Sequence, residues 1–344
     1  MNVITKHERP GVYSSYEASA YSAAAGKGKA VAVVAAGPET SVGKVYTWTS
    51  YSRAMSDVGQ CMLSDLARLV LKNGASLVYG VAVADDYEAA FAQVEAIEDA
   101  AVVVCDSTDV AVQQLLCSMV ESCSASRRER IAVTAGAAGE SVTALVARAA
   151  SLNHERMVLV APGDAAGDGG IRCAAAVAGA IAGNTDPALP LGGARLYGLD
   201  GLETSYEDGD IDLLVQGGVT PLEMLAGGCY VVRGITTRTT TGGVGDITWR
   251  ELTTILVVDE VIPGIRNALR AKFARAKNTE QSRGAIRSQV VMELEARVNR
   301  EIIDGYEDVT AQPLESDPTV CLVEFSFTVA HGLNQIWLSA HITV

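Results

Sequence analysis

Two loops that follow predicted strands contain the glycines that phosphate-binding sites require. The first loop covers residues 37–44 and ends in Gly43-Lys44. A P-loop has four residues between its glycines and a Ser or Thr after its lysine, because its N–H groups surround the phosphates while the hydroxyl reaches Mg²⁺. In this loop five residues separate the glycines, and Val45 follows the lysine. We therefore interpret residues 37–44 as an ordinary turn at the end of a strand.

The second loop, residues 136–139, has a glycine at each end and lacks the full dinucleotide-binding fingerprint G-x-G-x-x-G. Neither loop has the complete set of residues that its motif needs to wrap a phosphate in backbone N–H groups. Together the two loops define the alternative function that stays open, a nucleotide-binding α/β enzyme.

Side chains that could act as nucleophiles, bases or metal ligands are scattered along the chain. There is no G-x-S-x-G motif, and a Ser-His-Asp triad would depend on His154, which we interpret as a solvated loop residue. The histidines and carboxylates lack the spacing of a metal site, and the acidic groups at 85–86 and 207–210 lack the rest of a calcium loop. We expect no catalytic residue, no cofactor and no metal, and hence a protein that is not an enzyme.

The composition and the charge argue against several classes of protein. The chain of 344 residues has a net charge of −14, which disfavours the attraction to phosphates that nucleic-acid binders use. The first residues lack the apolar segment of a signal peptide, and the longest apolar run, near residues 174–182, is too short to span a bilayer. Seven cysteines without a C-x-x-C pair are typical of reduced thiols. We expect no nucleic-acid partner and no membrane partner for a chain that folds in a cytoplasm.

Short apolar runs alternate with helical stretches in the first half of the chain. The strand-like runs are 31–36, 77–83, 102–105, 131–134 and 157–161, and the helical stretches are 54–72, 87–98, 108–123, 140–151 and 174–182. Continuous apolar strands that alternate with helices are typical of a parallel sheet covered on both faces. The predicted fold class is α/β, with a parallel-sheet α/β core domain at residues 28–190.

The second half of the chain has a different pattern. Its strand-like segments are 194–199, 230–237 and 319–329, and its helical patterns are 247–261, 263–277 and 280–303. Pro263 fits either the first turn of a helix or a kink. We predict a C-terminal α+β domain at residues 191–333. Extended segments flank the two domains: an N-terminal arm and tether at 1–27 and a C-terminal strand at 334–344.

Both ends of the chain are predicted to be extended. Residues 336–344 alternate between an apolar and a polar face with a period of two, and Arg9-Pro10-Gly11 prevents a helix in the N-terminal arm. The residues that we assign to contacts between subunits are Val3, Ile4, Thr5, Val12, Tyr13, Ile336, Leu338, Ala340, Ile342 and Val344. An exposed strand can complete the sheet of a neighbour, because its N–H and C=O groups are unpaired. The alternative is a hairpin within the chain, between 319–329 and 336–344.

Positive charge is concentrated in one segment of this acidic chain. Residues 263–300 contain nine Lys or Arg and three Glu, a net charge of +6, so the remainder carries −20. The basic strip consists of Arg266, Arg270, Lys272, Arg275 and Lys277, which flank an apolar stripe at helical spacing. The strip could dock on an acidic surface, or it could be the solvated face of an amphipathic helix. A soluble binding module with an acidic partner is therefore a third hypothesis.

In its order of segments, the chain resembles the contractile tail sheath family of phages and phage-derived bacteriocins. The resemblance rests on RPGVY at 9–13, VAGAIAGNTDPALPLGGARLYGLDGL at 177–202 and EMLAGGCYVVRGITTRTT at 223–240, followed by the basic helices and the final strands. It covers essentially the whole chain, which would be a compact member of the family.

The resemblance implies a structural subunit of a contractile tail sheath. Such subunits form homo-oligomeric six-fold rings stacked helically around a tail tube protein, and their further partners are baseplate and tail terminator proteins. Arms from both termini cross to adjacent subunits and complete a shared small sheet, and a helix of the C-terminal domain faces the tube. The basic strip is the best match to that helix.

Contraction of such a sheath drives the tube through a cell envelope. The resemblance implies a phage tail or a phage-tail-like particle that is assembled in the cytoplasm of a bacterial host. The first domain of the family is sometimes likened to subtilisin. The Asp, His and Ser signature segments of that protease are missing here, so no peptidase activity is implied.

Overall fold

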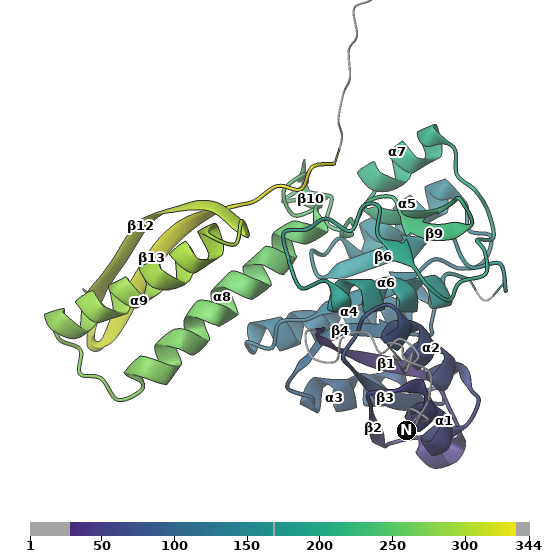
Figure 1. Ribbon diagram of the computed structural model, residues 1–344, viewed down its shortest axis with the longest axis horizontal. Coiled ribbons are helices and arrows are strands. Elements are labelled where there is room, and N and C mark those ends of the chain that lie inside the picture. Colours follow the sequence, from purple (N-terminus) through teal and green to yellow (C-terminus); the bar gives the residue numbers. More distant parts are fainter. Residues whose placement is uncertain (1–27, 168, 335–344) are drawn as a thin grey trace, which may run out of the picture.

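The computed structural model describes residues 28–167 and 169–334, so almost all of the predicted arm residues lie outside the described part. Within this part, nine strands form one mixed sheet in the order β2-β3-β1-β4-β5-β6-β8-β9-β7. A long helix leaves this α/β unit and leads to a smaller unit, which consists of a second helix and a two-stranded sheet (Figure 1).

The large sheet is parallel in its centre and antiparallel at its edges. Its parallel strands are β1 (Ala30–Ala36), β3 (Leu77–Val83), β4 (Ala100–Cys105), β5 (Ile131–Ala135), β6 (Met157–Ala161) and β8 (Val219–Leu225). Its antiparallel strands are β2 (Val45–Trp48), β7 (Arg195–Leu196) and β9 (Gly228–Val231). The helices are α1 (Tyr51–Val58), α2 (Met62–Lys72), α3 (Tyr87–Ala96), α4 (Val110–Ala125), α5 (Val142–Leu152), α6 (Ile171–Gly183) and α7 (Asp208–Gln216), with a short 3-10 helix η1 (Glu39–Ser41).

Helices cover both faces of the sheet, as the apolar strands predict. Val31 and Val33 of β1 pack into the layer that contains α2 and α6, whereas Ala32 and Val34 pack into the layer that contains α3 and α4. The predicted parallel-sheet α/β core is therefore confirmed, and each of its five predicted strands is present. No helix in the described part of the chain has the length and apolar character to cross a membrane.

Glycines on α6 explain the small-residue run in the middle of the sequence. Gly179 and Gly183 lie one turn apart and face the end of α2. A Cβ on Gly179 would lie 2.5 Å from the Val70 carbonyl oxygen, and one on Gly183 would lie 2.8 Å from the Gly74 Cα. The backbones of the two helices approach each other this closely because neither position carries a side chain.

Two predictions about the first half were wrong in detail. The predicted helix 54–72 is two helices, because Gly59 has a φ of +68° and ends α1. The predicted boundary at residue 190 falls inside the large sheet, since β7, β8 and β9 all belong to it. Strand β8 escaped prediction because Pro221 interrupts its apolar pattern. At Pro221 the strand passes from pairing with β6 to pairing with β9.

The smaller unit follows a short hairpin, whose strands β10 (Thr240–Thr241) and β11 (Val244–Gly245) have two residues each. It consists of α8 (Leu252–Phe273), α9 (Glu280–Val298), β12 (Ile303–Leu314) and β13 (Asp317–Val329). The apolar face of the β12–β13 sheet packs on both helices, so this unit has its own core. The predicted C-terminal α+β domain is thus confirmed as a separate unit with antiparallel strands, but it starts near α8 rather than at residue 191.

Helix α8 continues through Pro263, which sits in its interior rather than in its first turn. A proline in a helix leaves the carbonyl four residues earlier without its N–H partner. At Pro263 this is the carbonyl of Asp259. The buried Arg297 of α9 lies beside the same turn and donates to the next carbonyl, that of Glu260, and to the carboxylate of Glu293. Gly264 provides the room, because a Cβ there would overlap the Arg297 guanidinium.

Candidate assembly interface

The β12–β13 sheet is a separate pair of long strands outside the large sheet. Its two strands pair with each other, and in the described part of the chain neither outer edge has a neighbour. Val323, Phe325 and Phe327 of β13 face the helices, while Glu324 and Ser326 between them are exposed. The strand prediction for 319–329 is confirmed. Among the described residues, side chains reach some carbonyls of the two strands, but no further strand pairs with either outer edge.

After β13 the chain runs back toward the α/β unit. Residues 330–334 run from the small sheet toward the first turn of α8 and the β10–β11 hairpin (Figure 1). Gly332 lies against Pro190, and a Cβ there would be 2.8 Å from the Pro190 Cγ. One edge of β13 pairs along its length with β12, and its other edge has no strand partner in the described part of the chain. The alternative of a hairpin between 319–329 and 336–344 therefore stays a prediction. The residues 336–344 themselves lie outside the described part.

The predicted basic strip divides into one paired arginine and an exposed group at the far end of α8. Arg266 donates to Glu129 of the α/β unit at 2.8 Å. Lys272 donates to Gln289 of α9. Arg270, Arg275 and Lys277, together with Lys272, are exposed on the last turn of α8 and the loop after it. We call these four residues the basic tip.

The basic tip is joined to the free-edged sheet. Asn278, which follows Lys277, donates from its side-chain amide to the carbonyls of Pro318 at 2.8 Å and Val320 at 3.1 Å. These two residues begin β13, so the loop after α8 lies against the turn of the β12–β13 sheet. A contact at the basic tip is therefore coupled mechanically to the sheet that has free edges.

A buried ion pair, which the sequence did not reveal, holds α8 to the α/β unit. Both terminal nitrogens of Arg156, at the start of β6, donate to Asp259 of α8 at 2.7 and 2.8 Å. The two side chains are 7% and 10% exposed. Burial raises the pKa of Asp259, and the hydrogen bonds and charge of Arg156 oppose that rise. Glu129 has the opposite net shift. Burial raises its pKa, but the hydrogen bond and the charge of Arg266, with further partners, outweigh burial and leave the pKa below its usual value.

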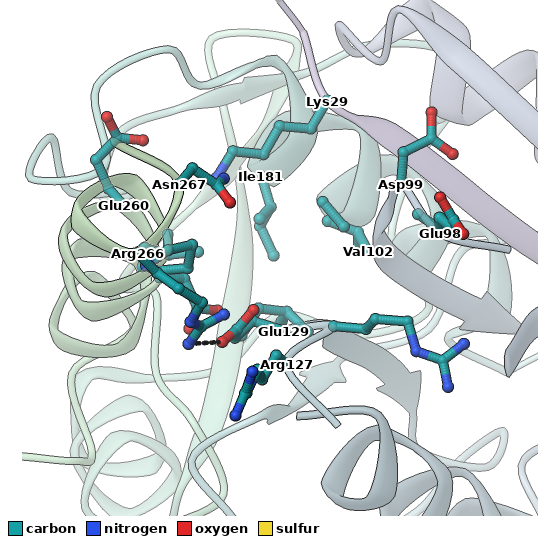
Figure 2. Close-up of a pocket in the computed structure, with 17 residues that line it drawn as sticks. Lys29, Glu98, Asp99, Val102, Arg127, Glu129, Ile181, Glu260, Arg266 and Asn267 are labelled. Carbon is teal, nitrogen blue, oxygen red and sulfur yellow. Dashed lines mark hydrogen bonds and ion pairs between the residues drawn. The ribbon is translucent and has the colours of Figure 1, made fainter. Parts of the chain in front are cut away.

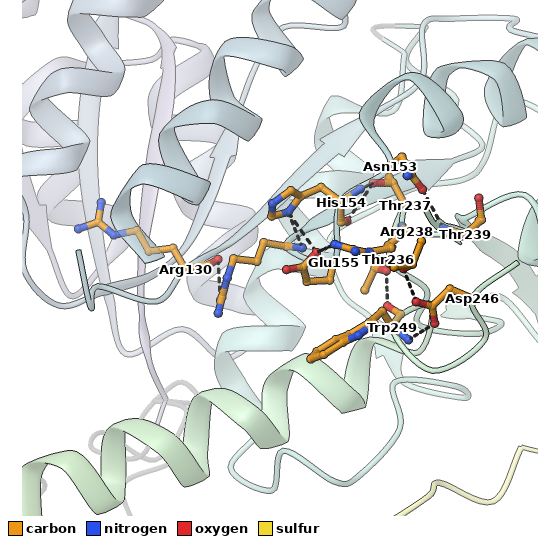
Figure 3. A network of polar contacts seen from close by, with 12 residues as sticks. Arg130, Asn153, His154, Glu155, Thr236, Thr237, Arg238, Thr239, Asp246 and Trp249 are labelled. Atoms are coloured by element: carbon orange, nitrogen blue, oxygen red, sulfur yellow. Dashed lines mark hydrogen bonds and ion pairs between the residues drawn. The ribbon is translucent and has the colours of Figure 1, made fainter. Parts of the chain in front are cut away.

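His154 belongs to a structural network beside this ion pair (Figure 3). Its Nδ1 accepts from the Arg156 N–H at 3.1 Å, and its backbone N–H and C=O both pair with the Thr237 hydroxyl. Its side chain is 15% exposed, so the expectation of a solvated loop residue was wrong. Burial lowers the pKa of His154. The Arg238 guanidinium pairs with Glu155 in the same network, which joins the start of β6 to the segment before α8.

Neither of the two glycine loops, 37–44 and 136–139, is arranged as a phosphate-binding loop. The loop after β1 enters η1 and then β2, so no α-helix N-terminus follows it. In the loop after β5 the Ala137 N–H donates to Glu140 at 2.8 Å and the Gly139 N–H donates to Glu203 at 3.3 Å. These carboxylates occupy the donors that a phosphate would need.

Comparisons with family models, curated proteins and solved structures all find tail sheath proteins. Residues 80–237 match the family described as phage tail sheath protein central domain, and residues 245–343 match the phage tail sheath C-terminal domain. The tail sheath protein of Bacillus phage SP01 is 26% identical over 253 residues, which cover 71% of this chain and 43% of that protein. The chain therefore spans less than half the length of this curated relative.

Solved structures share the fold at low sequence identity. A sheath tail protein from Listeria innocua has a TM-score of 0.73 at 14% identity, over 89% of this chain and 93% of that one. A sheath tail protein from Desulfitobacterium hafniense has a TM-score of 0.68 at 13% identity, over 93% and 100%. A chain of the anti-feeding prophage helical sheath in its contracted state has a TM-score of 0.72 at 14% identity, over 96% and 98%.

Proposed function

Because the chain belongs to the phage tail sheath family, we propose that it is the structural subunit of a contractile sheath, which polymerises helically around a tail tube and contracts to drive that tube through a cell envelope. The subunits form six-fold rings, and the partners at this level are further copies of the chain, the tail tube protein, and baseplate and tail terminator proteins. Assembly takes place in the cytoplasm of a bacterial host. The subunit performs no catalysis.

The observation that carries this proposal is the β12–β13 sheet, whose two outer edges have no strand partner among residues 28–167 and 169–334. A strand that adds to a sheet edge gains main-chain hydrogen bonds along its length, and these tolerate changes of sequence. Residues 336–344 of one neighbour and the arm around residues 3–13 of another are the strands that add to this sheet. Main-chain pairing lets the links persist while the subunits rotate and slide during contraction.

The basic tip is the surface that we assign to the tube. Arg270, Lys272, Arg275 and Lys277 project at the end of α8 farthest from the α/β unit (Figure 1). Charge contacts of this kind are screened by salt and break more readily than strand pairing. Arg266 contributes to the joint with Glu129 instead, and it contacts the tube only if that ion pair opens.

Reversing charge at the basic tip tests the tube assignment. We expect the triple substitution Arg270→Glu, Arg275→Glu and Lys277→Glu to reduce co-sedimentation with the tail tube protein by at least about tenfold, since like charges then face an acidic surface. The thermal unfolding of the subunit should stay within about 1 °C of wild type, because the three side chains are exposed.

The matched control reverses three exposed charges elsewhere, with Lys44→Glu, Arg53→Glu and Arg195→Glu on the α/β unit. These changes alter the net charge equally, so they separate a local contact from a general effect of charge. Equal loss of tube binding in both triple variants, or unchanged binding in the basic-tip variant, would show that another surface contacts the tube.

A further inference from the structure

A cavity lies at the joint between the α/β unit and α8 (Figure 2). Its volume is about 320 Å³, and it is bounded by the starts of β4 and β5, the end of α6 and the middle of α8. Its apolar wall includes Val102, Ile131, Ile181 and Leu256, which come from four different elements. The space is large enough for an aromatic side chain together with a few small residues.

The rim of the cavity carries charged side chains, and some of them form ion pairs with other residues of the chain. Glu129 pairs with Arg266, and Asp259 pairs with Arg156. Glu98 and Lys29 form no ion pair with any residue in the described part of the chain. Figure 2 shows the Lys29 side chain extending toward Asn267 of α8, with Glu98 on the opposite side of the opening. A carboxylate is therefore left at the rim to receive a cation.

The described chain begins at this cavity. Gly28 is the first described residue, and Lys29, the next one, lines the cavity wall. Residues 18–27, ASAYSAAAGK, consist of small residues with a single aromatic ring, Tyr21, and a single charged residue, Lys27. Six residues lie between Tyr21 and Gly28, and an extended chain over these seven Cα-to-Cα steps reaches about 25 Å. The tether can thus reach every wall of the cavity, and its attachment makes its local concentration high.

We propose that residues 18–27 of the same chain dock in this cavity, with the Tyr21 ring against the apolar wall and the Lys27 ammonium beside Glu98. The small side chains of the tether let the backbone pass between α8 and the sheet, which a bulky segment could not do. The arm would then leave the subunit at the joint itself. Tension on the arm from a neighbouring subunit would act on the contact between α8 and the α/β unit. The docking does not depend on the proposed sheath function.

Hydrogen–deuterium exchange of the full-length protein, read by mass spectrometry, tests this docking. Amides 20–27 should exchange at least about tenfold more slowly than those of residues 2–8, because docking must open before they exchange. Tyr21→Ala should remove that protection, whereas Tyr16→Ala should retain it. On the cavity side, Asn267→Trp should also remove it by filling the space, while Ala271→Trp, one turn further along the same exposed face of α8, should not. Unchanged protection of β4 and β5 shows that each variant is folded.

A mixing experiment distinguishes docking within the chain from docking by a neighbour. The Asn267→Trp protein, labelled with ¹⁵N, is assembled with an excess of unlabelled wild type, and the labelled peptides are followed by mass. Docking within the chain predicts that the labelled 18–27 segment stays unprotected, since its own cavity is blocked. Recovery of its protection would mean that it occupies a neighbour's cavity and would overturn the proposal. Rapid exchange of 20–27 in the wild type, or full protection in Tyr21→Ala, would overturn it as well.

Discussion

Deletion of residues 336–344 is expected to abolish polymer formation while the α/β unit stays folded. The strand lost would supply about four main-chain hydrogen bonds to a neighbour's sheet at about 1 kcal/mol each. A loss of about 4 kcal/mol raises the concentration needed for assembly by about a thousandfold, so pelleting should fall to background. We expect circular dichroism and the melting curve of the α/β unit to be retained, because the proposed partner of the deleted strand is a neighbour's small sheet. Among the described residues, the buried members of the cores of the large sheet end at Leu256. Deletion of 1–16 is expected to have the same outcome.

Two point substitutions sharpen this test, because adjacent residues of a strand face opposite sides. Leu338→Asp puts a charge on the predicted apolar face and should prevent assembly, whereas Ser339→Asp puts the same charge on the predicted polar face and should allow it. Polymer at the wild-type yield from either truncation, or equal effects of the two substitutions, would contradict strand exchange through this segment.

Removal of the Arg156 side chain is expected to be the most damaging single change to the subunit. Arg156→Met leaves Asp259 buried without its bidentate partner, which costs about 3–5 kcal/mol of the free energy of unfolding. The exposed pair of Arg53 and Asp57 provides the control, and Arg53→Met should cost less than about 1 kcal/mol. Urea unfolding followed by circular dichroism measures both.

The cost of Arg156→Met should depend on pH. Burial already raises the pKa of Asp259 in the wild type, and removing the arginine raises it further. A carboxyl whose pKa is higher in the folded protein than in the unfolded chain favours folding when it is protonated, and this contribution is lost as the pH rises. The deficit of the variant should therefore be smaller at pH 5 than at pH 8. The double variant Arg156→Met/Asp259→Leu should recover most of the stability. A deficit that is independent of pH, or no recovery, would show that the carboxylate is not the cause.

The sequence predicted best where one strong signal decides the local structure. The buried strands β1, β3 and β6 are runs without a charged residue that consist mainly of Val, Ala and Leu, and their bounds were predicted to within one residue. Strand β12 was missed because its sequence contains Gly305 and Pro313, and bulges interrupt its alternation, with Asp308 in a left-handed conformation. Only pairing with β13 and packing on α9 make such a segment a strand.

The candidate interface was predictable in part, for a related reason. The alternating pattern of β13 and the charge of the α8–α9 region are local signals, and both were visible in the sequence. The sequence did not show that Arg266 is separated from the rest of the basic strip, because its partner Glu129 is 137 residues away in the chain. The Arg156–Asp259 pair spans 103 residues, and no spacing rule connects two residues that only the fold brings together.

The central claim is that this subunit polymerises through strands shared with its neighbours. Negative-stain electron microscopy of the purified full-length protein, at low and at high salt, tests it most directly. We expect tubes or stacked rings with six-fold symmetry that persist at high salt, because main-chain pairing is not screened by salt as charge contacts are. A stable, monodisperse monomer at both salt concentrations would contradict it.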